Sequence, residues 1–96
     1  MKLNISKAVR EIRFLIPPLQ TSQAAVHKAF LDKHLESLRK KVPTITIREC
    51  DSIEPFIFMR YNYGKEEELR ANLSLEEMEQ GVQTLFDNAE KINKSL

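Results

Sequence analysis

The sequence predicts an α/β domain in which a mixed four-stranded sheet carries two helices on one face. Four short apolar segments have the two-residue period of strands, and two longer segments have the 3.6-residue period of amphipathic helices. Their order is strand, helix, strand, strand, strand, helix. A chain of 96 residues provides for one domain, which we assign to residues 1–96 with a core at about 7–95.

The first strand is predicted at residues 8–16, where side chains alternate between two faces. One face carries Ile12, Phe14 and Ile16, and the other carries Glu11, Arg13 and Leu15. Pro17 and Pro18 end the strand, because proline has no backbone N–H to donate.

The first helix is predicted at about residues 22–41, with Thr21 or Ser22 as its cap. Its apolar side chains fall within about half of the helical wheel, and its charged side chains occupy the other half. Residues 44–49 then alternate strictly and form the second strand: Ile45 and Ile47 point one way, and Thr44, Thr46 and Arg48 point the other.

Pro55 opens the third strand, predicted at residues 56–63. Residues 62–65 have the composition of a hairpin turn in which Gly64 takes a positive φ. Residues 66–70 form a short, charged fourth strand of the kind that lies at a sheet edge.

The last helix begins with a capping box of Ser74 and Glu77, and Leu73 and Met78 stand at the hydrophobic-staple positions. Gly81, inside this helix, costs about 1 kcal/mol relative to alanine, and a close approach to the sheet would compensate. The strand–helix–strand unit is long enough for a right-handed crossover. The complete order is the smallest thioredoxin-like arrangement.

Short motifs on these elements resemble a known family. They are Arg10-Glu11-Ile12-Arg13, Phe30-Leu31-Asp32-Lys33, Ile47-Arg48-Glu49-Cys50, Pro55 followed by Arg60-Tyr61 and Gly64, and the helix start at Ser74. Together they are similar to the thioredoxin-like accessory subunits of mitochondrial respiratory complex I, over residues 7–86. That domain family also includes certain mitochondrial ribosomal proteins.

The resemblance implies a non-catalytic, cofactor-free subunit that contacts its neighbours in the matrix arm of NADH:ubiquinone oxidoreductase. It would lie on the matrix side of the mitochondrial inner membrane as a peripheral subunit. The alternative is a mitochondrial ribosomal protein that contacts rRNA. Pro55 also stands where thioredoxin-like folds commonly have a cis proline, and we weigh a cis Glu54–Pro55 bond equally against a trans one.

The charge of the chain favours the complex I subunit over the ribosomal protein. Residues 1–48 hold ten basic and three acidic residues, and residues 49–96 hold five and eleven, for a net charge of +1. RNA-binding chains are usually strongly basic, so we expect no nucleic-acid partner. We also expect no homo-oligomer. The two halves either neutralise each other or present faces of opposite sign.

No residue pattern indicates catalysis or metal binding. Thioredoxin-type enzymes carry Cys-x-x-Cys after the first strand, but residues 17–20 are Pro-Pro-Leu-Gln and Cys50 is the chain's single cysteine. We expect Cys50 to be a small apolar filler. His27 and His34 lie about 10 Å apart along one helix and cannot share an ion. The longest apolar runs fall short of the roughly 18–20 residues that cross a membrane, so no direct membrane insertion is expected.

The sheet face that points away from the helices is the predicted partner-binding surface. The strand alternation places arginines beside apolar side chains there, a combination typical of protein–protein hot spots. The predicted residues are Arg13, Leu15, Arg48, Phe58 and Arg60. In the alternative interpretation these arginines only pair internally with Glu11 and Glu49.

Overall fold

The computed structural model describes residues 2–50, 54–62, 64–70 and 73–94. The elements are β1 (Val9–Ile16), a 3-10 turn η1 (Ser22–Ala24), α1 (Ala25–Lys41), β2 (Thr44–Glu49), β3 (Phe56–Tyr61), β4 (Glu66–Arg70) and α2 (Leu75–Lys94). The strands form one sheet in the order β2-β1-β3-β4, in which β1 runs parallel to β2 and antiparallel to β3. The predicted thioredoxin-like fold class is confirmed.

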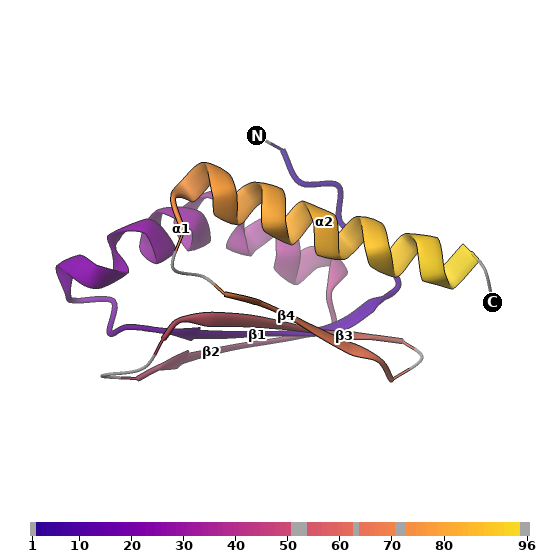
Figure 1. The fold of residues 1–96 in the computed structure, drawn as a ribbon, viewed down its shortest axis with the longest axis horizontal. Coiled ribbons are helices and arrows are strands. Elements are labelled where there is room, and N and C mark those ends of the chain that lie inside the picture. The colour runs from indigo at the N-terminus through magenta and orange to yellow at the C-terminus, as the bar shows by residue number, and fades with distance from the viewer. Residues whose placement is uncertain (1, 51–53, 63, 71–72, 95–96) are drawn as a thin grey trace.

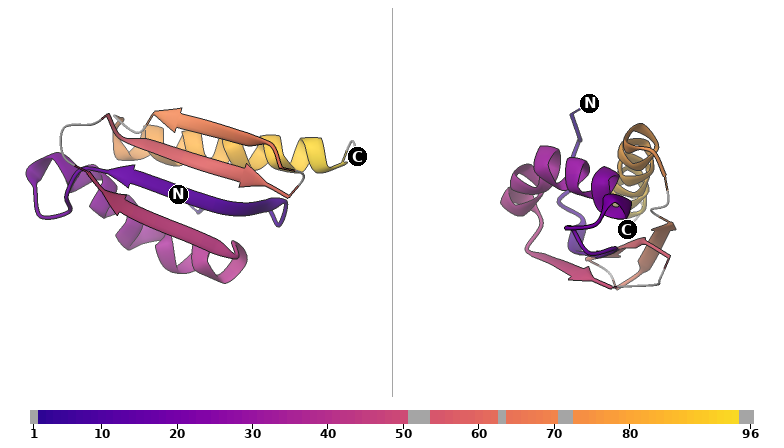
Figure 2. Two further views of the ribbon diagram at one scale, coloured as in Figure 1. Left: turned by 90° about the horizontal axis from the view of Figure 1, so that it is seen from below. Right: turned by 90° about the vertical axis from the view of Figure 1, so that its left-hand side faces the viewer.

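Both helices lie on the same face of the sheet (Figure 1). The other face carries no helix or strand among the described residues, and Figure 2, left, views the sheet from that side. The layer between sheet and helices is the core, and its largest fully buried side chains include Tyr61, Phe14, Phe30 and Phe86. The Tyr61 hydroxyl donates to the Leu85 carbonyl at 3.1 Å, so even the polar tip of this core residue is paired.

A β-bulge at Arg10 shifts which residues of β1 point toward the core. Val9 pairs with Tyr61 and Glu11 pairs with Arg60, so one extra residue stands on β1. Val9 and Ile12 are therefore both buried although they are three residues apart, and Arg10 is exposed. The bulge keeps a charged side chain out of the core without changing the alternation from Glu11 onward.

The start of the first helix differs from the prediction. Neither Thr21 nor Ser22 caps α1 with its side chain, because the 3-10 turn comes first and the N-cap residue of α1 is Ala24. The Thr21 hydroxyl instead donates to the Pro18 carbonyl at 2.7 Å, which closes the turn after the two prolines. Thr21 stands at the N-cap position of the 3-10 turn, three residues before the N-cap residue of α1, and its side chain makes no capping hydrogen bond.

The capping box of α2 is present as predicted. The Ser74 hydroxyl accepts from the Glu77 amide at 3.3 Å, and the Glu77 carboxylate accepts from the Ser74 amide at 3.2 Å. Gly81 lies over β4: a Cβ atom at this position would stand 2.7 Å from Leu69 Cδ2. The expected close approach of helix and sheet is therefore real.

The expectation for the β3–β4 turn also holds, since Gly64 has φ +88°. The expectation of an equal chance for a cis Glu54–Pro55 bond is wrong: the described residues contain no cis peptide bond. The trans isomer of an X–Pro bond is intrinsically favoured by about 0.5–1 kcal/mol. Phe56 pairs regularly with both Leu15 and Arg70, so nothing in the sheet demands the cis form.

Candidate functional site

The strand register arranges twelve side chains of the uncovered face into three cross-strand rows. We call this surface the open face; its rows, from β2 to β4, are Thr44–Glu11–Arg60–Glu66, Thr46–Arg13–Phe58–Glu68 and Arg48–Leu15–Phe56–Arg70. All twelve side chains are exposed or half-buried, whereas the intervening residues of β1 and β3 are buried. Side chains that alternate along each strand thus separate a core layer from a surface layer.

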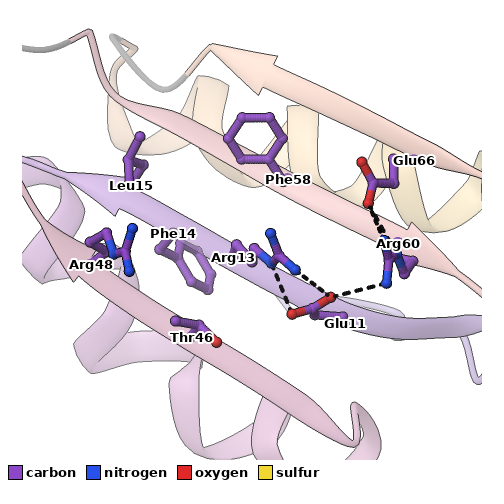
Figure 3. A pocket seen from close by; sticks show the side chains of 9 residues that line it. All are labelled: Glu11, Arg13, Phe14, Leu15, Thr46, Arg48, Phe58, Arg60 and Glu66. Carbon is purple, nitrogen blue, oxygen red and sulfur yellow. Dashed lines mark hydrogen bonds and ion pairs between the residues drawn. The ribbon is translucent and has the colours of Figure 1, made fainter.

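The first two rows are joined by a chain of ion pairs around Glu11. Arg13 Nε donates to Glu11 Oε2 at 2.9 Å, and an Arg60 nitrogen lies 4.0 Å from Glu11 Oε1. Arg60 also contacts the Glu66 carboxylate at 2.8 Å (Figure 3). The hydrogen bond from Arg13 holds the pKa of the Glu11 carboxyl below its ordinary value, and the charge of Arg60 acts in the same direction.

An apolar ridge crosses the same face. It consists of Leu15, Phe56 and Phe58, which are all half-buried. The rings of Phe56 and Phe58 have centroids 5.8 Å apart and are inclined by 34°. Water-exposed aromatic rings in contact on a sheet surface are a common anchor for another protein.

Arg48 stands apart from the ion pairs. It is exposed and forms no ion pair with any of the residues that the structure describes. Glu49, which the alternative interpretation names with Glu11 as an internal partner of the arginines, points to the other side and accepts a hydrogen bond from the Leu19 amide at 2.6 Å. The interpretation of purely internal pairing therefore fits Arg13 and Arg60 but not Arg48.

The five residues predicted from sequence meet in one shallow depression of about 500 Å³ (Figure 3). Its lining residues are Glu11, Arg13, Phe14, Leu15, Thr46, Arg48, Phe58, Arg60 and Glu66. Sequence reasoning missed Glu66 because it did not pair β3 with β4 residue by residue. The turn at Gly64 was the available signal, since a hairpin register fixes which residue lies opposite Arg60.

His34 takes part in a separate, buried contact between the two helices. His34 Nε2 lies 2.5 Å from Glu79 Oε2, and both side chains are almost fully buried. Lys33 Nζ reaches the same oxygen at 3.0 Å. The hydrogen bond with His34 holds the pKa of the Glu79 carboxyl below its ordinary range, and Lys33 acts in the same direction. His27, on the same helix as His34, is also buried.

The described residues contain no group of three or more His, Cys, Asp or Glu side chains that could hold a metal ion. Cys50 is half-buried at the end of β2. None of the helices in the described part of the chain combines the length and the apolar character needed to cross a bilayer. The segment between β1 and η1, where redox enzymes of this fold carry two thiols, is Pro-Pro-Leu-Gln followed by Thr21.

Fold and site together define a thioredoxin-like domain without the redox dithiol and with an open, arginine-rich sheet face. No family model matches the chain. The chain is similar to a curated plant protein, NADH dehydrogenase (ubiquinone) 1 alpha subcomplex subunit 2 of Arabidopsis thaliana. The two are 40% identical over 67 residues, and the match covers 66% of each chain. The chain belongs to the family of this alpha subcomplex subunit 2.

Proposed function

We propose that this protein is a non-catalytic accessory subunit of mitochondrial respiratory complex I. Its relative's name carries the proposal, because it places a protein 40% identical to this chain among the subunits of NADH dehydrogenase. The sequence supports the non-catalytic part, since one cysteine cannot perform dithiol–disulfide exchange within the chain.

The subunit lies on the matrix side of the inner membrane, bound to other subunits of the complex rather than inserted into the bilayer. It docks through the open face, as a single copy and without nucleic acid. The apolar ridge and the depression beside it support this choice of surface, because half-exposed aromatic side chains next to arginines are typical of interface anchors.

Native-gel separation of solubilised mitochondrial membranes tests the assignment. The chain, detected by an antibody or a tag, is expected in the band that oxidises NADH in the gel. Its co-migration with ribosomal subunits and absence from that band would overturn the assignment and favour the rRNA-contacting alternative. The same gel run on a strain without the chain reports whether the complex still assembles.

A further inference from the structure

The three arginines at the centre of the open face differ in whether this chain already neutralises them. Arg13 and Arg60 share the carboxylate of Glu11, and Arg60 also has that of Glu66. Arg48 has no ion pair among the described residues. A partner could therefore cover Arg13 and Arg60 without supplying any charge of its own.

Arg48 shares a row with the apolar ridge. It pairs with Leu15 across β1 and β2, and Leu15 pairs with Phe56 across β1 and β3. Neighbouring strands lie about 4.8 Å apart, so Arg48 on β2 is directly adjacent to Leu15 of the apolar ridge. Arg48 and Phe58 also line the same depression (Figure 3). A protein that covers the ridge consequently removes water from Arg48.

Covering an unpaired guanidinium is costly unless a carboxylate takes the place of the lost water. The residues that the structure describes supply no such group, which favours a carboxylate from the partner. At the other end of the row, the one ion pair of Arg70 within the described part of the chain is a 3.5 Å contact with the exposed Glu54. The row is thus cationic at both ends and apolar between them.

We propose that the open face binds a protein surface in which apolar side chains are flanked by carboxylates, one of which pairs with Arg48. The inference rests on the proposed function and adds the chemistry of the partner. It also ranks the arginines: Arg48 carries affinity, whereas Arg13 and Arg60 mainly hold Glu11 and Glu66 in place.

Replacement of the endogenous chain by variants in cells tests this ranking. The readout is the fraction of the chain that stays in the NADH-oxidising band of a native gel. We expect Arg48→Glu to lower this fraction at least about tenfold, and Arg13→Ala to lower it less than about threefold. Lys28→Glu, a charge reversal on the exposed side of α1, is the matched control and is expected to be neutral. Circular dichroism of each purified variant checks that it is folded.

A photo-crosslinking residue in place of Thr46 identifies the partner within the assembled complex. We expect crosslinks to a peptide of another subunit that contains Asp or Glu. Changing that carboxylate to lysine in the partner is expected to restore the binding of the Arg48→Glu chain.

The outcomes separate the two proposals. If Arg48→Glu remains in the band as the parent chain does, or if the crosslinks lead to RNA or to a peptide without carboxylates, the inference is wrong. In the first of these cases the proposed function stands. If the parent chain itself is missing from the band, the proposed function fails first.

Discussion

The buried contact between His34 and Glu79 gives a stability prediction that can be worked out from the structure. The perturbation is Glu79→Gln, which keeps the size of the side chain and one acceptor oxygen but removes the charge. Glu79 is a buried carboxylate that pairs with Lys33 and is hydrogen-bonded to His34, and removing one partner of a buried ion pair costs about 3–5 kcal/mol. The retained oxygen and the half-exposed Lys33, with 44% of its side chain accessible, reduce this value. We therefore expect a loss of about 2 kcal/mol at pH 7.

A loss of this size is a substantial part of the total, because a domain of this length is stabilised by about 5–14 kcal/mol. It corresponds to a decrease in Tm of about 8–16 °C. The assay is thermal unfolding followed by circular dichroism, with Glu76→Gln as the control. Glu76 is exposed in the first turn of the same helix, so its replacement tests the loss of charge without burial.

The pH dependence has a definite sign. Because the pKa of Glu79 is lower in the folded chain than its ordinary value of 4.5, its ionised form stabilises the fold above that value. This contribution is lost as the pH falls through the folded-state pKa. The difference in Tm between the parent chain and Glu79→Gln is therefore largest near pH 7, and it becomes smaller as the pH is lowered below about 4.5.

Two results would refute this reasoning. One is a Tm of Glu79→Gln within about 3 °C of the parent chain at pH 7. The other is a difference that persists unchanged at pH 3, which would mean that the charge of Glu79 has no part in it.

Three further predictions concern other parts of the molecule. Ser74→Ala should lower the free energy of unfolding by about 1 kcal/mol in urea titration, and Ser74→Asp should restore it, since either side chain accepts from the helix amides. Gly81→Ala should change the free energy of unfolding little, because the gain in helix propensity of about 1 kcal/mol is offset by displacement of Leu69. In a Leu69→Ala background the same substitution should raise the free energy of unfolding by about 1 kcal/mol. No change in that background would contradict the role given to Leu69. Phe58→Thr should alter the free energy of unfolding of the isolated chain by less than about 1 kcal/mol. It should nevertheless reduce the amount of the chain that is recovered with complex I. Recovery equal to that of the parent chain would contradict a role for the apolar ridge in docking.

Local sequence patterns predicted most of the fold because each one acts within a few residues. Alternation fixed the faces of β1 and β2, and the capping box fixed the start of α2. Features that depend on contacts distant in sequence were missed. The bulge at Arg10 shows only in the register of β1 against β3, and the predicted cap of α1 was wrong because a 3-10 turn at Ser22–Ala24 precedes the helix.

The buried contact between His34 and Glu79 could have been anticipated from the sequence. Glu79 lies four residues after Leu75 and three before Val82, so it occupies the apolar stripe of its helix, and His34 lies on the apolar side of the other helix. An acidic and a basic side chain on two facing apolar stripes favour a buried pair. The open face was predicted because one alternation assigns the residues of a strand to both faces of the sheet. Which carboxylates pair with its arginines could not be predicted, because that depends on the pairing register of β1, β3 and β4.

The charge asymmetry between the two halves of the chain is resolved in part by contacts between them. Lys33 and His34, from the basic half, both contact Glu79 of the acidic half. On the open face Arg60 of the acidic half contacts Glu11 of the basic half. Mutual neutralisation therefore operates at Glu79 in the helix layer, whereas Arg48 has no ion pair with any residue that the structure describes.

Cysteine labelling of the open face in the assembled complex tests the central claim most directly. In a Cys50→Ser background, Thr46→Cys places a thiol in the depression, and Lys28→Cys places one on the exposed side of α1 as a reference. We expect a maleimide to label both positions rapidly in the isolated chain, and to label Thr46→Cys far more slowly than Lys28→Cys in the complex. Equally rapid labelling of Thr46→Cys in the isolated chain and in the complex would contradict docking through this face.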